Sequence, residues 1–276
     1  MSGNLCVGID LGGTNIQAGV VDASGALLGR ADTKTKAERG ADAVLDRIRK
    51  VSDEAIEEAG VDRADLTALG IGAPGAIDTE SGVVLNAPNL RWNHFPLAEK
   101  LSERVGLPVV VDNDVNVGTW GEYKKGAAGS YSDLLGIFVG TGIGAGLVIG
   151  GRLYTGAGRT AGEIGHTIVR ADAPLGQRTL ENLASRTAMR NQLVALIEAN
   201  HASAMMDIVE GDITKIRSKA IAKAIEQEDE LTLTVVKQAA QYVATSIANA
   251  VTLLSLPAVV LGGGFNDARG DCCVTT

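Results

Sequence analysis

Cysteine is scarce in this chain of 276 residues, which contains three: Cys6, Cys272 and Cys273. The first falls in an apolar run near the N-terminus and the other two are adjacent, so they do not form the spaced framework of paired cysteines found in small secreted domains. This usage is typical of a protein in a reducing compartment, and we expect a cytoplasmic location.

Long apolar runs and basic runs are also missing. No window approaches the roughly eighteen apolar residues of a membrane-spanning helix, and no basic region followed by an apolar segment marks a secretory signal. Lys and Arg number 25 against 33 Asp and Glu, which gives a net charge of −8. Because no cluster of positive charge compensates for this deficit, we expect no association with a membrane or with nucleic acid.

Apolar residues make up 45% of the chain, enough for one large core or two smaller ones. We expect two lobes, a smaller N-terminal one at 1–115 and a larger one at 116–276. Glycine is abundant, with 35 residues concentrated at turns between short apolar runs, which indicates many tight connections.

Periodicity and turn residues predict strands and helices in both halves of the chain. The segment from Asp22 to Gly25 has the composition of a hairpin turn, and Gly60 is a natural helix stop. We expect strands at 5–10, 16–21, 26–32, 66–71, 109–111 and 258–261, with three more between 134 and 155. We expect helices at 40–59, 96–105, 180–200, 213–228 and 230–255.

The segment from Val7 to Thr14 runs from an apolar strand into the carboxylate of Asp10 and then into a glycine-rich turn. Gly12 and Gly13 lack Cβ atoms, so a phosphate chain can approach the backbone N–H groups of this turn closely. Asp10, at the strand end, could hold a hydrated Mg²⁺ against those phosphates. A hairpin turn with a capping Asp is the other interpretation of the same residues.

The glycine turn recurs in the second half of the chain. A gapless alignment of 7–21 with 135–149 pairs Gly8 with Gly136, Ile9 with Ile137, Gly12 with Gly140 and Val20 with Val148. The second copy carries Gly140, Thr141 and Gly142 in its turn, but Phe138 replaces the acid. Two glycine turns in matching places of two half-chains suggest a duplicated fold with a nucleotide between the halves.

A second set of polar residues follows the buried strand at 109–111, which delivers Asp112, Asn113 and Asp114 at its carboxyl end, where open α/β sheets bind ligands. Asp114 is a candidate general base, because a strand end can hold its carboxylate rigidly toward a cleft. From position alone it could equally cap a helix that starts near Val115.

Glu163 and His166 lie three residues apart in a loop rich in glycine. A lone His is more often structural, but an acid and an imidazole between glycines suit ligand contact better than packing.

Motifs of a known family occur in order over residues 5–264. They are Asp10-Leu-Gly-Gly-Thr14, Gly72-Ala-Pro-Gly75, Asn86-Ala-Pro-Asn-Leu90, Asn113-Asp114, Gly140-Thr-Gly-Ile-Gly144, Ala161-Gly-Glu-Ile-Gly-His166 and Val260-Leu-Gly-Gly-Gly264. Together they resemble the ROK family of sugar kinases and repressors, within the actin-like ATPase superfamily. The resemblance implies an α/β fold of two actin-like (ribonuclease H-like) lobes with mixed sheets, and a cleft between them that closes over a sugar and ATP.

The resemblance also implies an activity and a site. It suggests a glucokinase-like, ATP-dependent hexose kinase that uses Mg²⁺, acts on D-glucose first of all, and forms a homodimer. It implies Asp114 as the base, and Asn113, Glu163, His166 and Glu181 as contacts of the sugar hydroxyls. The residues implied for the nucleotide are Asp10, Gly12, Gly13, Thr14, Gly140, Thr141, Gly142 and Gly263, with Asp10 also implied for the metal.

Two departures from the family pattern lead to further expectations. Many members hold zinc with the His of this loop and three cysteines just before the sugar-binding Glu, but the segment from Pro174 to Glu181 has no cysteine. We therefore expect no zinc site. Family members also continue for several tens of residues beyond the triple glycine, whereas here 265–276 remain, so we expect a larger lobe that is shortened at its C-terminus and a weakened nucleotide site.

Three other functions fit parts of the sequence. A sugar-binding protein or inactive kinase would keep the sugar site and lose the nucleotide. A sugar-responsive repressor would need a DNA-binding segment before the first glycine motif, where 1–4 alone precede the strand. A dinucleotide-binding dehydrogenase is suggested by the glycines at 140–144, but no acidic residue follows about twenty positions later at a strand end.

Overall fold

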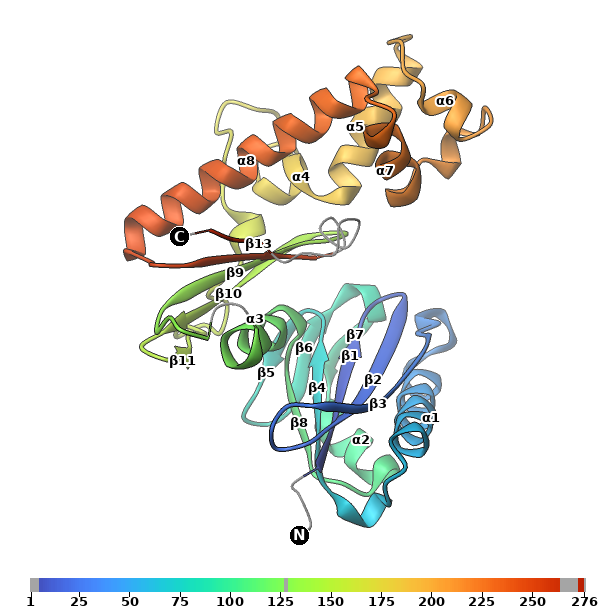
Figure 1. The fold of residues 1–276 in the computed structure, drawn as a ribbon, viewed down its shortest axis with the longest axis vertical. Coiled ribbons are helices and arrows are strands. Elements are labelled where there is room, and N and C mark those ends of the chain that lie inside the picture. Colours follow the sequence, from blue (N-terminus) through green and yellow to red (C-terminus); the bar gives the residue numbers. More distant parts are fainter. Residues whose placement is uncertain (1–4, 127–128, 264–272, 276) are drawn as a thin grey trace. The chain divides into compact units, whose positions relative to one another are not determined.

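The computed structural model describes residues 5–126, 129–263 and 273–275 and divides into two compact units (Figure 1). Unit 1 comprises Met1–Gly121 and Gly156–Thr160, and unit 2 comprises Glu122–Thr155 and Ala161–Thr276. The first division falls inside α3 (Asp114–Lys125), a few residues beyond the expected boundary near 115. The expected α/β class with mixed sheets is confirmed.

Unit 1 is built on a five-stranded sheet in the order β3-β2-β1-β4-β8. Strand β1 pairs antiparallel with β2 and parallel with β4, and β4 pairs parallel with β8. The strands are β1 (Leu5–Leu11), β2 (Asn15–Val21), β3 (Leu27–Lys34), β4 (Leu66–Ala73) and β8 (Val109–Asn113). Since all three parallel strands end at the same edge, the polar residues that follow them are brought together there.

Helix α1 (Ala41–Ala59) covers β2 and β3, and α2 (Leu97–Val105) packs against α1 and β8 (Figure 1). The buried face of α1 repeats every three or four residues through Val44, Ile48, Val51 and Ala55, as the apolar spacing predicts. Gly60 ends the helix with a φ of 65°, a left-handed conformation that glycine adopts without strain.

A second, three-stranded sheet in unit 1 was not predicted from the sequence. It joins β5 (Ala76–Asp78), β6 (Val83–Ala87) and β7 (Trp92–Phe95), and the rings of Trp92 and Phe95 stack with centroids 4.4 Å apart. Arg159 of the segment Gly156–Thr160 forms ion pairs with Asp78 and Glu80, which attaches this segment to the small sheet.

Unit 2 has a five-stranded sheet in the order β11-β10-β9-β12-β13. Its strands are β9 (Leu134–Val139), β10 (Ile143–Ile149), β11 (Arg152–Leu153), β12 (Val259–Gly262) and β13 (Cys273–Thr275). Its helices are α4 (Leu180–Ala184), α5 (Arg186–Glu198), α6 (Met205–Ile208), α7 (Ser218–Glu226) and α8 (Glu230–Leu254). The helix expected at 180–200 is thus two helices, because Ser185 is extended and caps α5 by accepting a hydrogen bond from the N–H of Ala188 at 3.1 Å.

Short 3₁₀ segments complete the described chain. They are η1 (Ala37–Arg39), η2 (Arg63–Asp65), η3 (Pro88–Leu90), η4 (Ile164–His166) and η5 (Ile213–Lys215). Within the described ranges, no helix has the length and apolar content that a membrane crossing requires.

The first four strands of each sheet share one topology, which supports the duplication predicted from the glycine turns. In each unit an antiparallel hairpin (β1 and β2, or β9 and β10) is followed by a parallel partner of its first strand (β4 or β12). The gapless alignment is correct for the first strand of each hairpin but wrong for the second. Leu11 pairs with Ile16 across a four-residue turn, whereas Val139 pairs with Ile143 across a three-residue turn.

The shorter second turn shifts the structural equivalents by one residue. Val20 therefore corresponds to Leu147 and not to Val148, and the buried positions Ile16 and Ala18 correspond to the buried Ile143 and Ala145. A one-residue slip moves a side chain to the other face of a sheet, so only the gapped alignment keeps the buried faces matched.

Candidate functional site

Thr35, a residue that the sequence did not single out, fixes the first glycine turn of unit 1 through two hydrogen bonds. Thr35 is fully buried, its hydroxyl donates to the carbonyl of Gly12 at 2.6 Å, and its N–H donates to the carbonyl of Thr14 at 2.8 Å. The N–H of Gly12 closes the turn on the carbonyl of Asn15 at 2.9 Å. Gly13 and Thr14 are exposed, and no described residue accepts a hydrogen bond from their N–H groups, which are therefore available to an anion.

Asp10 is the penultimate residue of β1 and pairs with Gln17 on β2 and Gly72 on β4. Desolvation raises the pKa of Asp10 above its usual range, although part of the side chain reaches solvent. Burial is the sole cause of this shift, so within the described residues no donor or cation offsets the desolvation of the carboxylate. A carboxylate without a compensating donor, beside a turn whose N–H groups are available to an anion, fits a hydrated Mg²⁺, which takes one or two carboxylates and completes its shell with water and phosphate oxygens.

The parallel register places Asp10 and Asp112 in one row across the sheet of unit 1. Asp10 on β1 pairs with Gly72 on β4, and Gly72 pairs with Asp112 on β8. Residues in register on neighbouring strands point to the same face, so Asp10 points to the face of the sheet on which α3 begins. A Cβ at Gly72 would lie 3.2 Å from the Cα of Asp114, and the glycine therefore allows α3 to approach β4 closely.

Asn113 caps α3. Its side-chain oxygen accepts hydrogen bonds from the N–H groups of Val115 at 3.0 Å and Asn116 at 3.2 Å, and its amide nitrogen donates to the carbonyl of Gly75 at 3.1 Å. An amide side chain can both donate to and accept from a sugar hydroxyl. In Asn113 the oxygen is already used by the helix cap, so one amide N–H remains, which can only donate to a ligand.

Asp114 is the first residue of α3, and one of its carboxylate oxygens accepts from the N–H of Val115 at 2.9 Å. The side chain of Asn113 already caps the N–H groups of Val115 and Asn116, so helix capping alone does not explain an Asp at position 114. Asp114 instead lies where β8 ends and α3 begins, at the edge of the sheet at which α/β folds bind ligands.

In unit 2 the second glycine turn closes on itself and is held by helices α4 and α5. The N–H of Gly140 donates to the carbonyl of Gly142 at 2.8 Å. The first residues of α5 bind the carbonyl groups of the turn: the N–H of Arg186 donates to Gly140 at 3.0 Å and the hydroxyl of Thr187 donates to Thr141 at 2.8 Å.

Glu181 on α4 supports the same turn. Its carboxylate accepts from the N–H of Ile143 at 2.8 Å and occupies the space that a side chain on Gly142 would need. The structure therefore assigns Glu181 a positioning contact that the sequence did not predict, while its contact with sugar hydroxyls stays a prediction.

The loop that carries Glu163 and His166 lies against β10 beside Glu181. Gly162, at a φ of 94°, accepts from the N–H of Ala145 at 3.0 Å, and a Cβ on Gly165 would lie 3.4 Å from the Cβ of Glu181. The side chains of Glu163 and His166 are 53% and 71% exposed, with 3.8 Å between their nearest oxygen and nitrogen. Unit 2 thus brings together three of the four residues predicted for the sugar, and two of these three are open to a ligand.

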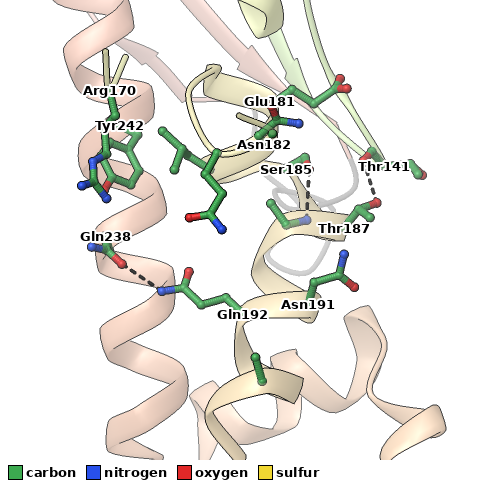
Figure 2. Close-up of a pocket in the computed structure, with 15 residues that line it drawn as sticks. Thr141, Arg170, Glu181, Asn182, Ser185, Thr187, Asn191, Gln192, Gln238 and Tyr242 are labelled. Carbon is green, nitrogen blue, oxygen red and sulfur yellow. Dashed lines mark hydrogen bonds between the residues drawn. The ribbon is translucent and has the colours of Figure 1, made fainter. Parts of the chain in front are cut away.

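A polar cavity of about 620 Å³ begins at the second glycine turn and continues between α5 and α8. Figure 2 shows Gln192 on α5 reaching toward Gln238 on α8, and the two amides are 3.0 Å apart in a hydrogen bond. The cavity is lined by Thr141 and Glu181 from the predicted site, and by Arg170, Gln177, Asn182, Asn191 and Tyr242 among others.

The third glycine segment ends β12. Gly263 has a φ of 98°, and a side chain there would collide with the backbone of Val139, so glycine is required on both grounds. Phe138, which occupies the place of Asp10 in the second copy, pairs with Gly262, and its ring lies where a Cβ of that residue would be. Gly264 lies outside the described residues.

No group of three or more His, Cys, Asp and Glu side chains able to hold a metal ion occurs within the described residues. The absence of a structural zinc site stays a prediction. A Mg²⁺ bound chiefly by phosphates and one carboxylate does not require such a group.

Comparisons with a family model, with curated proteins and with solved structures all point to the same family. Residues 6–271 match the ROK family. The chain is 35% identical to a glucokinase of Streptomyces coelicolor over 275 residues, which is 97% of this chain and 84% of the relative. The structure matches a crystal structure of a ROK family glucokinase from Streptomyces griseus in complex with glucose and AMPPNP, with a TM-score of 0.85, 35% identity and coverage of 96% of this chain and 85% of that one.

A regulator is also similar. A putative xylose repressor from Caldicellulosiruptor sp. is 31% identical over 262 residues, which is 94% of this chain and 65% of the repressor.

Proposed function

Because the chain belongs to the ROK family, we propose that it transfers the terminal phosphoryl group of ATP to a hydroxyl group of a hexose, with D-glucose to glucose 6-phosphate as the first reaction to test. The observation that carries the proposal is the edge of the unit 1 sheet. There, a glycine turn with unengaged N–H groups, a carboxylate with a raised pKa and an Asp at a helix N-terminus lie on neighbouring strand ends.

Asp114 acts as the general base in this proposal. Its carboxylate accepts the proton of the attacking sugar hydroxyl, and its place at the start of α3, directly after β8, holds it at the strand end. Asn113 orients the sugar with its remaining amide N–H while its oxygen stays on the helix cap.

Each glycine turn can bind phosphate oxygens through its backbone N–H groups, since the carbonyl groups of Gly12 and Thr14 in the first turn and all three in the second are already engaged within their own unit. Mg²⁺ held by Asp10 would offset the negative charge that develops on the phosphate oxygens. Glu163, His166 and Glu181 select the sugar, because a sugar that lacks a matching hydroxyl leaves a polar group unpaired.

Sugar-dependent ADP release over a panel of hexoses tests the proposal. We expect release with at least one hexose and a loss of about 10²- to 10⁴-fold in kcat for Asp114→Asn, the range typical of a general base. Thermal melting of the variant shows whether it is folded. ADP release that the substitution leaves unchanged would overturn the role of Asp114.

Sugar binding without transfer is the second candidate, favoured by the similarity to the xylose repressor. Calorimetry separates the two, since a sugar-binding protein binds glucose or xylose and gives no heat with ATP, whereas a kinase binds both ligands.

A further inference from the structure

Arg186 is attached to the second glycine turn through its backbone. It is the first residue of α5, and its N–H donates to the carbonyl of Gly140 at 3.0 Å. The preceding Ser185 caps the helix, so the start of α5 is fixed against the turn. Neither the glycine motif nor the spacing of charges in the sequence singles out this arginine.

The guanidinium of Arg186 lies beside the same turn. Its Nη2 atom is 3.9 Å from the position that a Cβ on Gly140 would take. Its Nη1 atom donates to the hydroxyl of Ser218 at 3.3 Å, which holds the group in place. Its Nε atom is buried and has no hydrogen-bond partner in the part of the chain that the structure describes.

The second glycine turn has a negative charge beside it, and a cation is needed to offset this charge if the turn is to bind a phosphate. The Glu181 carboxylate is bound to Ile143, the residue that follows the turn, and it opposes the approach of a phosphate. A guanidinium offers five N–H donors in a planar fork that matches phosphate oxygens, and the Nη2 of Arg186 is the donor that lies beside the turn.

We propose that Arg186 binds the phosphate chain of the nucleotide at the second glycine turn and supplies the positive charge that offsets Glu181. The inference rests on the proposed kinase function for the identity of the ligand. It predicts that Arg186 sets the affinity for nucleotide phosphates and has little influence on the affinity for the sugar.

Arg190 provides a matched control on the same helix. Its Nε donates to the carbonyl of Ile216 at 2.9 Å, so both arginines connect α5 to the segment around the start of α7. Arg186 in addition lies at the glycine turn. Arg186→Gln and Arg190→Gln therefore remove the same charge from the same helix and differ in that contact.

The experiment measures ADP binding by calorimetry, with the KM values for ATP and hexose alongside. We expect Arg186→Gln to raise the Kd for ADP and the KM for ATP about tenfold, as loss of a charge-assisted contact does, and to change the hexose KM less than twofold. Arg190→Gln should leave the Kd for ADP within about twofold of the wild type. Arg186→Lys keeps the charge and loses the fork, so an intermediate Kd is expected, and this variant serves if Arg186→Gln does not fold.

Equal ADP affinity in the wild type, Arg186→Gln and Arg186→Lys would overturn the inference, as would a wild type that does not bind ADP. ADP binding that depends on Arg186 in a protein that phosphorylates no hexose would support the inference and refute the proposed function.

Discussion

Thr35 and Gly12 are joined by a 2.6 Å hydrogen bond from a fully buried hydroxyl to the carbonyl of the first glycine turn. The bond connects the end of β3 to the turn that follows β1, two places 23 residues apart in sequence. It keeps the carbonyl of Gly12 directed at the buried Thr35, so the N–H of Gly13 in the same peptide group points away toward solvent. Stability and phosphate binding should therefore both depend on Thr35.

Thr35→Val, which keeps the shape and removes the hydroxyl, tests this dependence. We expect a loss of about 1–3 kcal/mol in the free energy of unfolding, because the carbonyl of Gly12 loses its partner in a buried place, and a severalfold rise in the KM for ATP. Urea denaturation and steady-state kinetics measure the two effects. Thr67→Val is the control, since the Thr67 hydroxyl donates to the carbonyl of Leu5 at 3.0 Å, at the other end of β1. It should leave the KM for ATP unchanged, and an equal rise in both variants would contradict the role given to Thr35.

Asp10→Asn should stabilise the nucleotide-free protein at neutral pH while reducing its activity. The folded protein raises the pKa of Asp10, so ionisation of this group favours the unfolded state, and stability is lost as pH rises from the ordinary value of about 4 to the folded value. Above the folded pKa the loss is constant, and Asn avoids it. The melting temperature of the variant should exceed that of the wild type at pH 7, and the two should converge below about pH 4. If the melting temperatures still differ below about pH 4, the ionisation of Asp10 is not the cause of the difference.

Gly75→Ala tests the turn that Asn113 anchors. Gly75 has a φ of 95°, and a side chain there would also collide with the carbonyl of Asn86. Gly40 has nearly the same φ, 92°, with no atom within 4 Å of its Cβ position, so Gly40→Ala measures backbone strain alone. We expect about 1 kcal/mol for Gly40→Ala and clearly more for Gly75→Ala, measured by urea denaturation. Equal costs would mean that the backbone near Gly75 moves to avoid the carbonyl.

Glu181→Gln separates the two contacts of Glu181. The amide keeps an oxygen that can accept from Ile143 and loses the negative charge, so stability should change by less than about 1 kcal/mol. A severalfold higher KM for the hexose would support the predicted contact with the sugar. If the KM for ATP alone changes, Glu181 acts only through the glycine turn.

The sequence predicted those features whose signal is local. Helix α1, the turn at Asp22–Gly25 and the strand before Asn113 agree with the structure, because apolar spacing and turn residues lie next to the elements that they define. The strands of the β5-β6-β7 sheet have 3–5 residues each, too short for an alternating pattern to stand out.

The supporting residues of the site could not be predicted in this way. Thr35 acts on a turn 23 residues away and Arg186 on one 46 residues away, and neither belongs to a motif. The gapless alignment also missed the extra residue in the first hairpin turn. The glycines of the first strands match with or without a gap in the turn, so they give no information on the register of the second strands.

The inequality between the two turns has a consequence for metal binding. The first turn has four residues and follows a carboxylate on its incoming strand, whereas the second has three and follows a phenyl ring. The two turns are therefore not interchangeable, because only the incoming strand of the first offers an oxygen ligand that could share a metal ion with a bound phosphate.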